Sequence, residues 1–387
     1  MHSEYKSVYL KPNKERALNN RHPWLFSGAV ARTDQQLRIG DPVVVRDHGA
    51  NFLAIGHWCG DHGLVCRLVS FDPKRIVDQA FYRQRFFEAK SLRTGLGLPN
   101  AQTNGYRLLN GEGDGLPGLV CDLYAESASI QLSNPGLRAI VPDLSDFLCA
   151  ECGCEHIFIQ DHEEKTTRWL LGGLEECSFR EHGLRFTAKL GKGQKTGHFL
   201  DQRDNRLRIG QIAHGRVVLD AFSYSGGFSM HALQGNAARV TSVDISAKAI
   251  EFCRAQVAEN GFHDAHEAIV ADCFDYLRQI EAGRYDLMIL DPPAFAKTAQ
   301  AVPQAARGYK DINLNAMKAI GKGGLIFTFS CSQHVDRDLF QKIVFGAAKD
   351  SGREVKIISE FSEGPDHPVS LYCPQSRYLK GLGLFVH

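Results

Sequence analysis

The sequence lacks the marks of a membrane, secreted or metal-binding protein. No apolar run approaches the roughly 18 residues that a membrane helix needs, and the residues after Met1 contain no apolar stretch of a signal peptide. The eleven cysteines are odd in number, and no second pair at zinc-finger spacing accompanies Cys149, Cys152 and Cys154. We therefore expect a cytoplasmic protein with reduced thiols, no metal and no membrane partner.

Strong charge and the common phosphate-binding sequences are also absent. The net charge is +1, so the whole molecule does not attract nucleic acid through its charge alone. Two segments of the chain, however, are locally rich in positive charge. Residues 1–21 carry five Lys or Arg against two acids, and residues 185–208 carry seven against two, which makes both clusters candidates for phosphate contacts or for ordinary solvated surface. There is no GxGxxG and no Walker lysine, so neither a dinucleotide nor a triphosphate is expected.

The pattern of turns divides the chain into three expected domains. Residues 1–72 contain short β-like runs separated by Gly and Asp turns, which predicts a small β-barrel. Residues 73–185 combine a helical stretch with hairpin-like strands, which predicts an α+β module. Residues 186–387 alternate strands and helices, which is typical of an α/β domain with a parallel sheet covered on both faces. Its strands are expected at 216–222, 239–245, 266–272, 285–291 and 324–330, its helices at 226–235, 247–260, 273–282, 310–321 and 336–350, and two further strands at 354–361 and 378–386.

Acidic residues recur where these strands end. Asp220, Asp244, Asp272 and Asp291 each stand at the C-terminal tip of an expected parallel strand, and all such tips meet at one edge of a sheet, where ligands bind. An acid at the second tip suits a ribose diol. An aspartate at the first tip suits a cation, such as the ammonium and sulfonium of S-adenosylmethionine (SAM). The pattern predicts a class I SAM-dependent methyltransferase whose product is S-adenosylhomocysteine.

Small and aromatic residues extend this expected cofactor site. The turn after the first strand contains small residues, which let a ligand approach the backbone closely. At the third strand tip, the residues after Asp272 could pack against the ring of the cofactor. The expected cofactor residues are Asp220, Phe222, Ser223, Gly226, Asp244, Asp272, Cys273 and Asp291.

The residues at two further strand tips are candidates for binding the substrate and for catalysis. Asp291-Pro292-Pro293-Ala294-Phe295 forms a rigid turn that is suited to hold a planar base, with Phe295 placed to stack on it. Cys331 ends the fifth strand. Carbon 5 of a pyrimidine is a poor nucleophile until a thiolate adds to carbon 6, so a cysteine at this edge is a candidate nucleophile. His334 and the helix that starts near Asp336 are candidates to favour the thiolate.

With these motifs assembled, nearly the whole chain resembles the RlmI-like family of ribosomal RNA large subunit methyltransferases. Besides the strand-tip motifs, the resemblance rests on three segments. They are Arg21 to Phe26 followed by Gly40-Asp41, as in a PUA RNA-binding domain; Lys195 to Arg203; and Asp366-His367-Pro368 ahead of Tyr378-Leu379-Lys380-Gly381.

The resemblance implies a seven-stranded Rossmann-like methyltransferase domain that makes 5-methylcytosine in 23S ribosomal RNA. It implies that Cys331 is the nucleophile, that the Asp291 loop lines the cytosine pocket and that Gln202 and Arg203 help close the SAM site. A second cysteine found in another branch of such enzymes is replaced by Pro293, so the proton on carbon 5 needs another base, for which Asp366 and His367 are candidates. The assembly is expected to be a monomer or homodimer.

Two alternatives stay open at this point. An enzyme that methylates an exocyclic amine, such as N2 of guanine, would use the Pro-Pro loop and need no cysteine. A non-catalytic RNA-binding assembly factor would retain the fold and bind RNA without transferring a methyl group. The Cys331→Ala variant separates the first alternative from carbon-5 chemistry, and methyl transfer itself separates the second.

Overall fold

The computed structural model describes residues 5–34, 36–191 and 197–387, and all counts below refer to this part of the chain. The chain folds into two compact units, which we describe separately. Unit 1 comprises residues 1–181, 187–200 and 365–376, and unit 2 comprises residues 182–186, 201–364 and 377–387.

Unit 1 begins with a curled sheet in the order β2-β6-β5-β4-β1-β3, in which only β1 and β4 pair in parallel among the described pairs. Alternating apolar residues such as Val43, Val45 and Ala54 are fully buried and form its core, as expected for strands with one face turned inward. Its strands are β1 (Lys6–Leu10), β2 (Trp24–Phe26), β3 (Val30–Thr33), β4 (Pro42–Arg46), β5 (Phe52–Trp58) and β6 (Leu64–Ser70), with the short helix α1 (Arg16–Asn19).

The second part of unit 1 is a five-stranded sheet in the order β11-β10-β9-β8-β7 with two helices packed against it. Its elements are α2 (Gln79–Gly95), β7 (Gly105–Asn110), β8 (Leu119–Tyr124), β9 (Ser127–Leu132), α3 (Val141–Cys152), β10 (His156–Asp161) and β11 (Thr166–Leu171). The expected α+β content is confirmed, but β9 and β11 were not predicted. Ser127–Leu132 has the burial pattern of a central strand although it contains serines and a glutamine, because neighbouring strands cover it on both sides.

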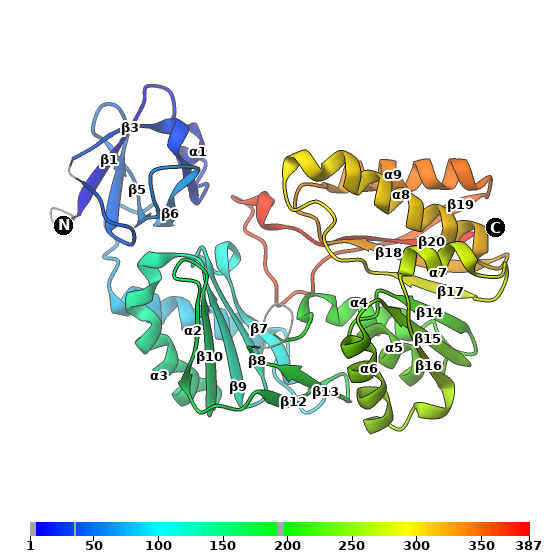
Figure 1. Cartoon of the computed structure of the whole chain (residues 1–387). Coiled ribbons are helices and arrows are strands. Elements are labelled where there is room, and N and C mark those ends of the chain that lie inside the picture. The colour runs from blue at the N-terminus through cyan, green and yellow to red at the C-terminus, as the bar shows by residue number, and fades with distance from the viewer. Residues whose placement is uncertain (1–4, 35, 192–196) are drawn as a thin grey trace. The chain divides into compact units, whose positions relative to one another are not determined.

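Unit 2 contains the predicted α/β domain, a seven-stranded sheet in the order β16-β15-β14-β17-β18-β20-β19. The first five strands in this order are parallel, and β20 pairs antiparallel with both β18 and β19. In Figure 1, helices α7, α8 and α9 lie on one face of the sheet and α4, α5 and α6 on the other. The strands are β14 (Val217–Ala221), β15 (Arg239–Asp244), β16 (His266–Val270), β17 (Leu287–Leu290), β18 (Gly324–Ser330), β19 (Val355–Phe361) and β20 (Lys380–Val386).

The helices of unit 2 agree with the sequence prediction except that α4 was not predicted and α8 begins earlier than expected. They are α4 (Arg203–Gly210), α5 (Gly227–Gln234), α6 (Ala247–Glu259), α7 (Cys273–Gln279), α8 (Val302–Ala319) and α9 (Arg337–Ser351). The expected start of α8 at residue 310 was wrong, because Pro303 stands in its first turn, where a proline is tolerated. The helix therefore begins two turns earlier and includes Tyr309.

Two further segments were not anticipated. The ribbon of β12 (Glu176–Glu181) and β13 (Leu184–Lys189) lies where the chain passes from unit 1 to unit 2. Residues 365–376, which connect β19 to β20, belong to unit 1 although both strands belong to unit 2. None of the helices in the described ranges is both long and apolar enough to span a membrane.

Candidate active site

The tip of β14 holds a buried aspartate that is bound by its own following helix. Asp220 is 1% exposed, and its Oδ2 accepts hydrogen bonds from the backbone N–H and the hydroxyl of Ser229, at 3.0 and 2.7 Å. The Ser229 hydroxyl is also hydrogen-bonded to the hydroxyl of Ser242 on β15, and that hydroxyl is hydrogen-bonded to Nε2 of His266. Burial raises the pKa of Asp220 to about 7. A cationic ligand at this tip would favour the ionised carboxylate.

Asp244, at the tip of β15, is hydrogen-bonded to the loops that follow β14 and β15. Asp244 Oδ2 accepts from the backbone N–H of Tyr224 at 3.0 Å, and Oδ1 accepts from the N–H of Ser246 at 2.8 Å. The carboxylate therefore holds the β14 loop against β15 and keeps lone pairs for a further donor, since each oxygen can accept more than one hydrogen bond. This arrangement fits the predicted role of Asp244 toward a ribose diol.

The residues after β16 have structural roles that the sequence analysis did not assign to them. Asp272 is the N-cap of α7, and its Oδ1 accepts from the N–H groups of Phe274 and Asp275. Cys273 is buried. Its Sγ accepts from the N–H of Phe222 at 3.2 Å and donates to the carbonyl of Val243 at 3.5 Å. Burial raises the pKa of Cys273 to about 12, so this thiol is neutral and links the strand tips.

The turn between β14 and α5 requires glycine. Gly226 has φ +80°, and a Cβ there would overlap the Sγ of Cys253. Phe222 and Tyr224 also have positive φ, at 62° and 47°, which is uncommon for non-glycine residues. The Ser223 hydroxyl is buried and has no hydrogen-bond partner among the described residues. A tight backbone cradle with an unused donor, beside Asp220, fits SAM.

The two residues implicated by the Lys195 to Arg203 motif lie where α4 begins. Gln202 is 2% exposed, its Oε1 accepts from Asn205 at 2.6 Å, and its buried Nε2 has no partner within the described ranges. Arg203 is buried and its Nε donates to Asp204 at 2.9 Å. The burial of Gln202 and its unused donor fit a residue that faces a ligand. Lys192, Lys195 and Thr196 lie outside the described residues.

Cys331 and the Pro-Pro loop lie together at the tips of two adjacent strands. β17 pairs in parallel with β18, with Leu290 opposite Thr328, so the residues that follow the two strands leave the sheet side by side. The Sγ of Cys331 lies 4.0 Å from the carbonyl oxygen of Pro292. Cys331 is half-buried, and Pro293 is exposed. The thiol and the predicted base-holding turn thus form one site.

Hydroxyl groups on both sides of Cys331 fix this loop. The Tyr309 hydroxyl forms hydrogen bonds of 2.9 Å with those of Ser330 and Ser332, and the Ser332 hydroxyl accepts from the N–H of Ala296 at 3.1 Å. The cysteine loop and the Pro-Pro loop are therefore joined through Tyr309 of α8. Sequence analysis missed this tyrosine because it started α8 after it, and the serines that flank Cys331 were the signal that a hydroxyl network lies there.

Phe295 lies in an aromatic cluster instead of standing alone. Its ring centroid is 4.6 Å from that of Tyr309, 5.7 Å from Phe274 and 6.5 Å from Phe222. The side chain is half-buried, so part of the ring is committed to packing while the rest is accessible. The cluster connects the first, third and fourth strand tips.

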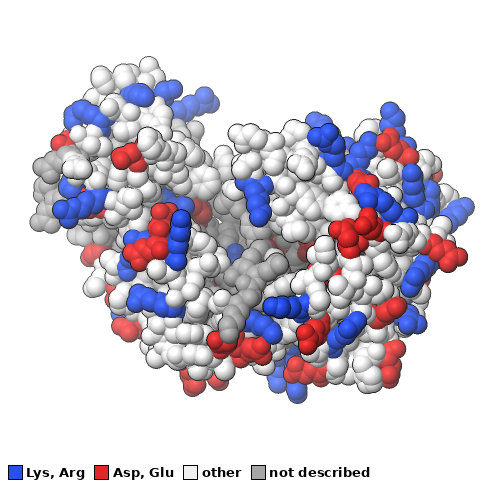
Figure 2. Space-filling model, viewed as in Figure 1, with Lys and Arg blue, Asp and Glu red and all other residues white. Residues whose placement is uncertain are grey.

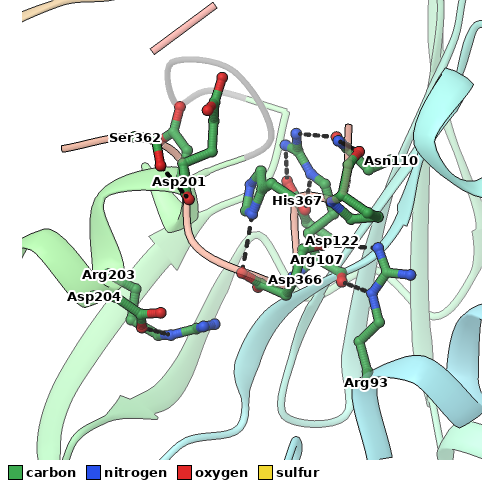
Figure 3. A network of polar contacts seen from close by, with 12 residues as sticks. Arg93, Arg107, Asn110, Asp122, Asp201, Arg203, Asp204, Ser362, Asp366 and His367 are labelled. Atoms are coloured by element: carbon green, nitrogen blue, oxygen red, sulfur yellow. Dashed lines mark hydrogen bonds and ion pairs between the residues drawn. The ribbon is translucent and has the colours of Figure 1, made fainter. Parts of the chain in front are cut away.

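Asp366 and His367 belong to unit 1 and are wholly buried there. His367 Nδ1 lies 3.0 Å from Asp366 Oδ1, and Asp366 Oδ2 accepts from the backbone N–H of Arg107 at 2.9 Å. Figure 3 shows the contact between His367 and Asp366 as a dashed line, together with the neighbouring Arg93 and Arg107. His367 Nε2 is buried without a partner among the described residues.

An ion-pair network holds this segment in unit 1. The guanidinium of Arg93, 0% exposed, binds both oxygens of Asp114, at 2.5 and 2.8 Å, and donates to the carbonyl of Asp366 at 2.7 Å. A Cβ at Gly113 would overlap the carbonyl oxygen of Pro368. The glycine-rich loop 111–115 is thus small because residues 365–376 pack on it, which agrees with its interpretation as a structural turn.

The two basic clusters differ in the structure. In residues 1–21, Lys11, Lys14 and Arg21 are exposed, whereas in residues 185–208 both Arg203 and Arg206 are buried. Arg185 and Arg208 of the second cluster are exposed, so among the described residues both clusters contain exposed cations, and the first has more of them. Figure 2 shows positive and negative side chains interspersed over the face it presents, in keeping with the small net charge.

Comparison with known proteins decides the family. Residues 136–347 match the model of S-adenosylmethionine-dependent methyltransferases, and residues 8–71 match that of a PUA-like domain. The ribosomal RNA large subunit methyltransferase I of Alteromonas mediterranea is 37% identical over 97% of this chain and 97% of its own length. That of Escherichia coli strain SMS-3-5 is 36% identical over 97% and 98%. This chain belongs to the ribosomal RNA large subunit methyltransferase I family.

Solved structures support the same fold for this family member. A protein from Streptococcus mutans described as a SAM-dependent methyltransferase superposes with a TM-score of 0.84 at 22% identity, over 98% of this chain and all of that one. A second methyltransferase, crystallised with S-adenosylhomocysteine, gives a TM-score of 0.86 at 22% identity over the same shares. The predicted fold class and SAM as the cofactor of this methyltransferase are confirmed by the family match.

Proposed function

We propose that this methyltransferase transfers the methyl group of SAM to carbon 5 of a cytosine in 23S ribosomal RNA. The observation that carries the proposal is the 4.0 Å contact between Cys331 Sγ and the carbonyl of Pro292, which joins a nucleophile to a loop suited to a planar base. Methylation of an exocyclic amine needs no thiol at that position, whereas carbon-5 chemistry does.

The chemistry of the chain's own residues follows from this arrangement. SAM, when bound, supplies an electrophilic methyl group. The thiolate of Cys331 forms a bond to carbon 6, and the electron pair of the 5,6 double bond makes carbon 5 nucleophilic enough to take the methyl. A base then removes the proton from carbon 5, the double bond re-forms, and the Sγ–carbon 6 bond breaks to release Cys331. Asp220, Asp244, Ser223 and Gln202 are the residues we assign to hold SAM.

The Asp366–His367 pair is our candidate for that base. If Asp366 accepts the Nδ1–H of His367, the neutral imidazole keeps a lone pair on Nε2, which is the form that a general base needs. His367→Gln keeps a hydrogen-bonding side chain of similar size and removes the basic nitrogen. We expect this variant to accumulate a covalent protein–RNA adduct that survives denaturing electrophoresis, and normal turnover without adduct would exclude His367 as the base.

The relatives' name supplies the class of RNA. A PUA-like domain and exposed Lys11, Lys14 and Arg21 on it support RNA as the partner. The target base has to leave its stack, because a thiol cannot reach carbon 6 inside a helix. We therefore infer that the substrate cytosine is extruded from 23S ribosomal RNA or lies in an unpaired segment of it.

The deciding experiment is mass spectrometry of nucleosides from unmodified 23S RNA incubated with SAM and either the native protein or Cys331→Ala. We expect 5-methylcytidine with the native protein and a loss of about 10³-fold or more with the variant. Cys149→Ala, at an exposed thiol, is the matched control and keeps activity. Methylguanosine that persists in Cys331→Ala would establish the exocyclic-amine alternative, and RNA binding without any methyl transfer would establish the assembly-factor alternative.

A further inference from the structure

A buried lysine lies beside the loop that carries the proposed nucleophile. Lys380 opens β20 and pairs with Ser330 of β18, the residue before Cys331. It is 6% exposed. Its Nζ donates to the carbonyl oxygen of Ser332 at 2.6 Å and to that of Val335. The ammonium is thus inserted into the turn that follows Cys331.

This ammonium has no carboxylate partner. Within the described ranges, no acidic oxygen lies within ion-pair distance of Lys380 Nζ, and its two acceptors are neutral carbonyls. Burial lowers the pKa of Lys380 to about 8, while the negative charge of a Cys331 thiolate acts in the opposite direction. A buried cation without a counter-ion is costly, so the arrangement calls for an anion nearby.

The other charged groups around Lys380 already have partners. Glu363 accepts from the N–H groups of Tyr378 and Leu379 at 2.7 and 2.8 Å. Asp336 caps α9 through the N–H of Leu339, and Arg337 pairs with Glu360. Glu363 and Asp336 favour the charged form of Lys380 from a distance, but neither forms an ion pair with it among the described residues.

Both helpers that the sequence suggested for Cys331, His334 and the start of α9, lie at exposed positions. His334 is exposed, and the N-terminus of α9 is occupied by the carboxylate of Asp336, whose negative charge offsets the helix dipole. Tyr309 of α8, whose pKa burial raises, contributes a neutral hydroxyl that contacts the cysteine loop. Lys380, by contrast, is a buried cation whose Nζ contacts this turn directly.

We propose that Lys380 is a positioning residue that stabilises the thiolate of Cys331 and fixes the turn that carries it. Its two carbonyl bonds hold Ser332 and Val335 in place, and its charge favours the anionic sulfur. The catalytic meaning of this role rests on the proposed carbon-5 chemistry. The thiolate itself is testable without RNA or SAM, so the two proposals fail separately.

The test is alkylation of the full-length protein by iodoacetamide over a series of pH values, with the rate at the Cys331 peptide followed by mass spectrometry. Since only thiolates react, the pH midpoint reports the thiolate. Exposed Cys149 in the same digest is the internal reference. We expect the Cys331 midpoint to lie at least about one pH unit below that of Cys149 in the native protein.

Two variants separate charge from structure. Lys380→Met removes the charge and keeps the length, and Lys380→Arg keeps the charge. We expect Lys380→Met to raise the Cys331 midpoint and to slow alkylation at neutral pH about tenfold, while Lys380→Arg retains a midpoint closer to the native one. A purely structural role would change the rate at every pH without moving the midpoint, and that result would overturn the proposal.

The native protein alone also decides the question if Lys380→Met does not fold, as judged by its melting temperature. A native Cys331 midpoint equal to or above that of Cys149 would contradict a thiolate stabilised by Lys380. If the midpoint is low but Cys331→Ala still methylates RNA, the thiolate stands and the carbon-5 proposal falls.

Discussion

The Sγ of Cys331 lies 4.0 Å from the carbonyl oxygen of Pro292, across the gap between two neighbouring parallel strands. The two residues are 39 positions apart in the sequence, and the pairing of β17 with β18 brings them together. The contact converts two separate motifs, a strand-end cysteine and a Pro-Pro turn, into one site.

Removing the hydroxyl of Tyr309 is expected to loosen this site. Tyr309→Phe takes away the partner of both Ser330 and Ser332, which should cost about 1–2 kcal/mol of stability and lower kcat more than it raises KM. Urea denaturation and steady-state methylation measure the two effects. Tyr276→Phe, which removes one hydroxyl of the Tyr276–Tyr285 pair in the same unit, should cost similar stability and leave kcat unchanged. An equal fall in kcat for both variants would contradict the role of Tyr309.

SAM affinity should depend on the ionisation of Asp220. Its pKa is raised to about 7 by burial, and a cationic ligand needs the ionised form. Affinity should therefore be constant well above pH 7 and fall below it, approaching about tenfold per pH unit. Calorimetric titration of SAM across this range measures the slope. In Asp220→Asn we expect weak binding whose pH dependence is lost, and an unchanged slope would assign it to another group.

The same aspartate should make the ligand-free protein less stable at high pH. The pKa of Asp220 rises from an ordinary 3.8 to about 7 on folding, so the folded state holds the proton more tightly than the unfolded state between these values. Stability contributed by this group is full below about pH 4 and declines as the pH rises to about 7. Melting temperatures of Asp220→Asn should exceed those of the native protein at pH 8, without SAM, and match them more closely at pH 5.

Gly226 offers a test of the cofactor turn with a matched control. Gly226 and Gly261 both have φ +80°, but a Cβ overlaps Cys253 at Gly226 and meets nothing at Gly261. Gly261→Ala should cost about 1 kcal/mol, the price of the backbone conformation alone. Gly226→Ala should cost about 3 kcal/mol or more, because overlap is added, and should weaken SAM binding. Equal unfolding free energies for the two variants would show that the turn is not tightly packed.

Breaking the buried ion pair of unit 1 should be far more harmful than breaking an exposed one. Arg93→Met leaves Asp114 buried without its partner and should cost about 3–5 kcal/mol, because the side chains are 1% and 4% exposed. Arg278→Met, whose pair with Asp311 is 49% and 32% exposed, should change the unfolding free energy little, because exposed ion pairs are screened by solvent. Denaturation monitored separately in each unit, for example by hydrogen exchange, measures both. A small effect of Arg93→Met would mean that water or a neighbouring group compensates Asp114.

Much of the site was readable from the sequence, since it depends on local order. A strand that ends in Asp220, Asp244 or Cys331 brings that residue to the carboxyl edge of the sheet, whatever the rest of the chain does. The spacing of strands and helices therefore determined the fold class and the edge at which the chemistry lies. The family resemblance added Gln202, whose burial and unused Nε2 would otherwise have been ordinary loop features.

Other features depended on contacts between distant segments. Tyr309 binds the loop of Cys331 only because α8 packs across β18, and Lys380 reaches that loop only because β20 pairs antiparallel with β18. Residues 365–376 pack in unit 1 because Arg93 and Asn110 donate hydrogen bonds to their backbone carbonyls and Gly113 leaves room for them. The sequence by itself determined which residues stand at the strand tips, because that is set by local periodicity. The tertiary structure decided which hydroxyls, cations and carbonyls surround them, because buried polar groups are satisfied by whatever segment the packing brings near.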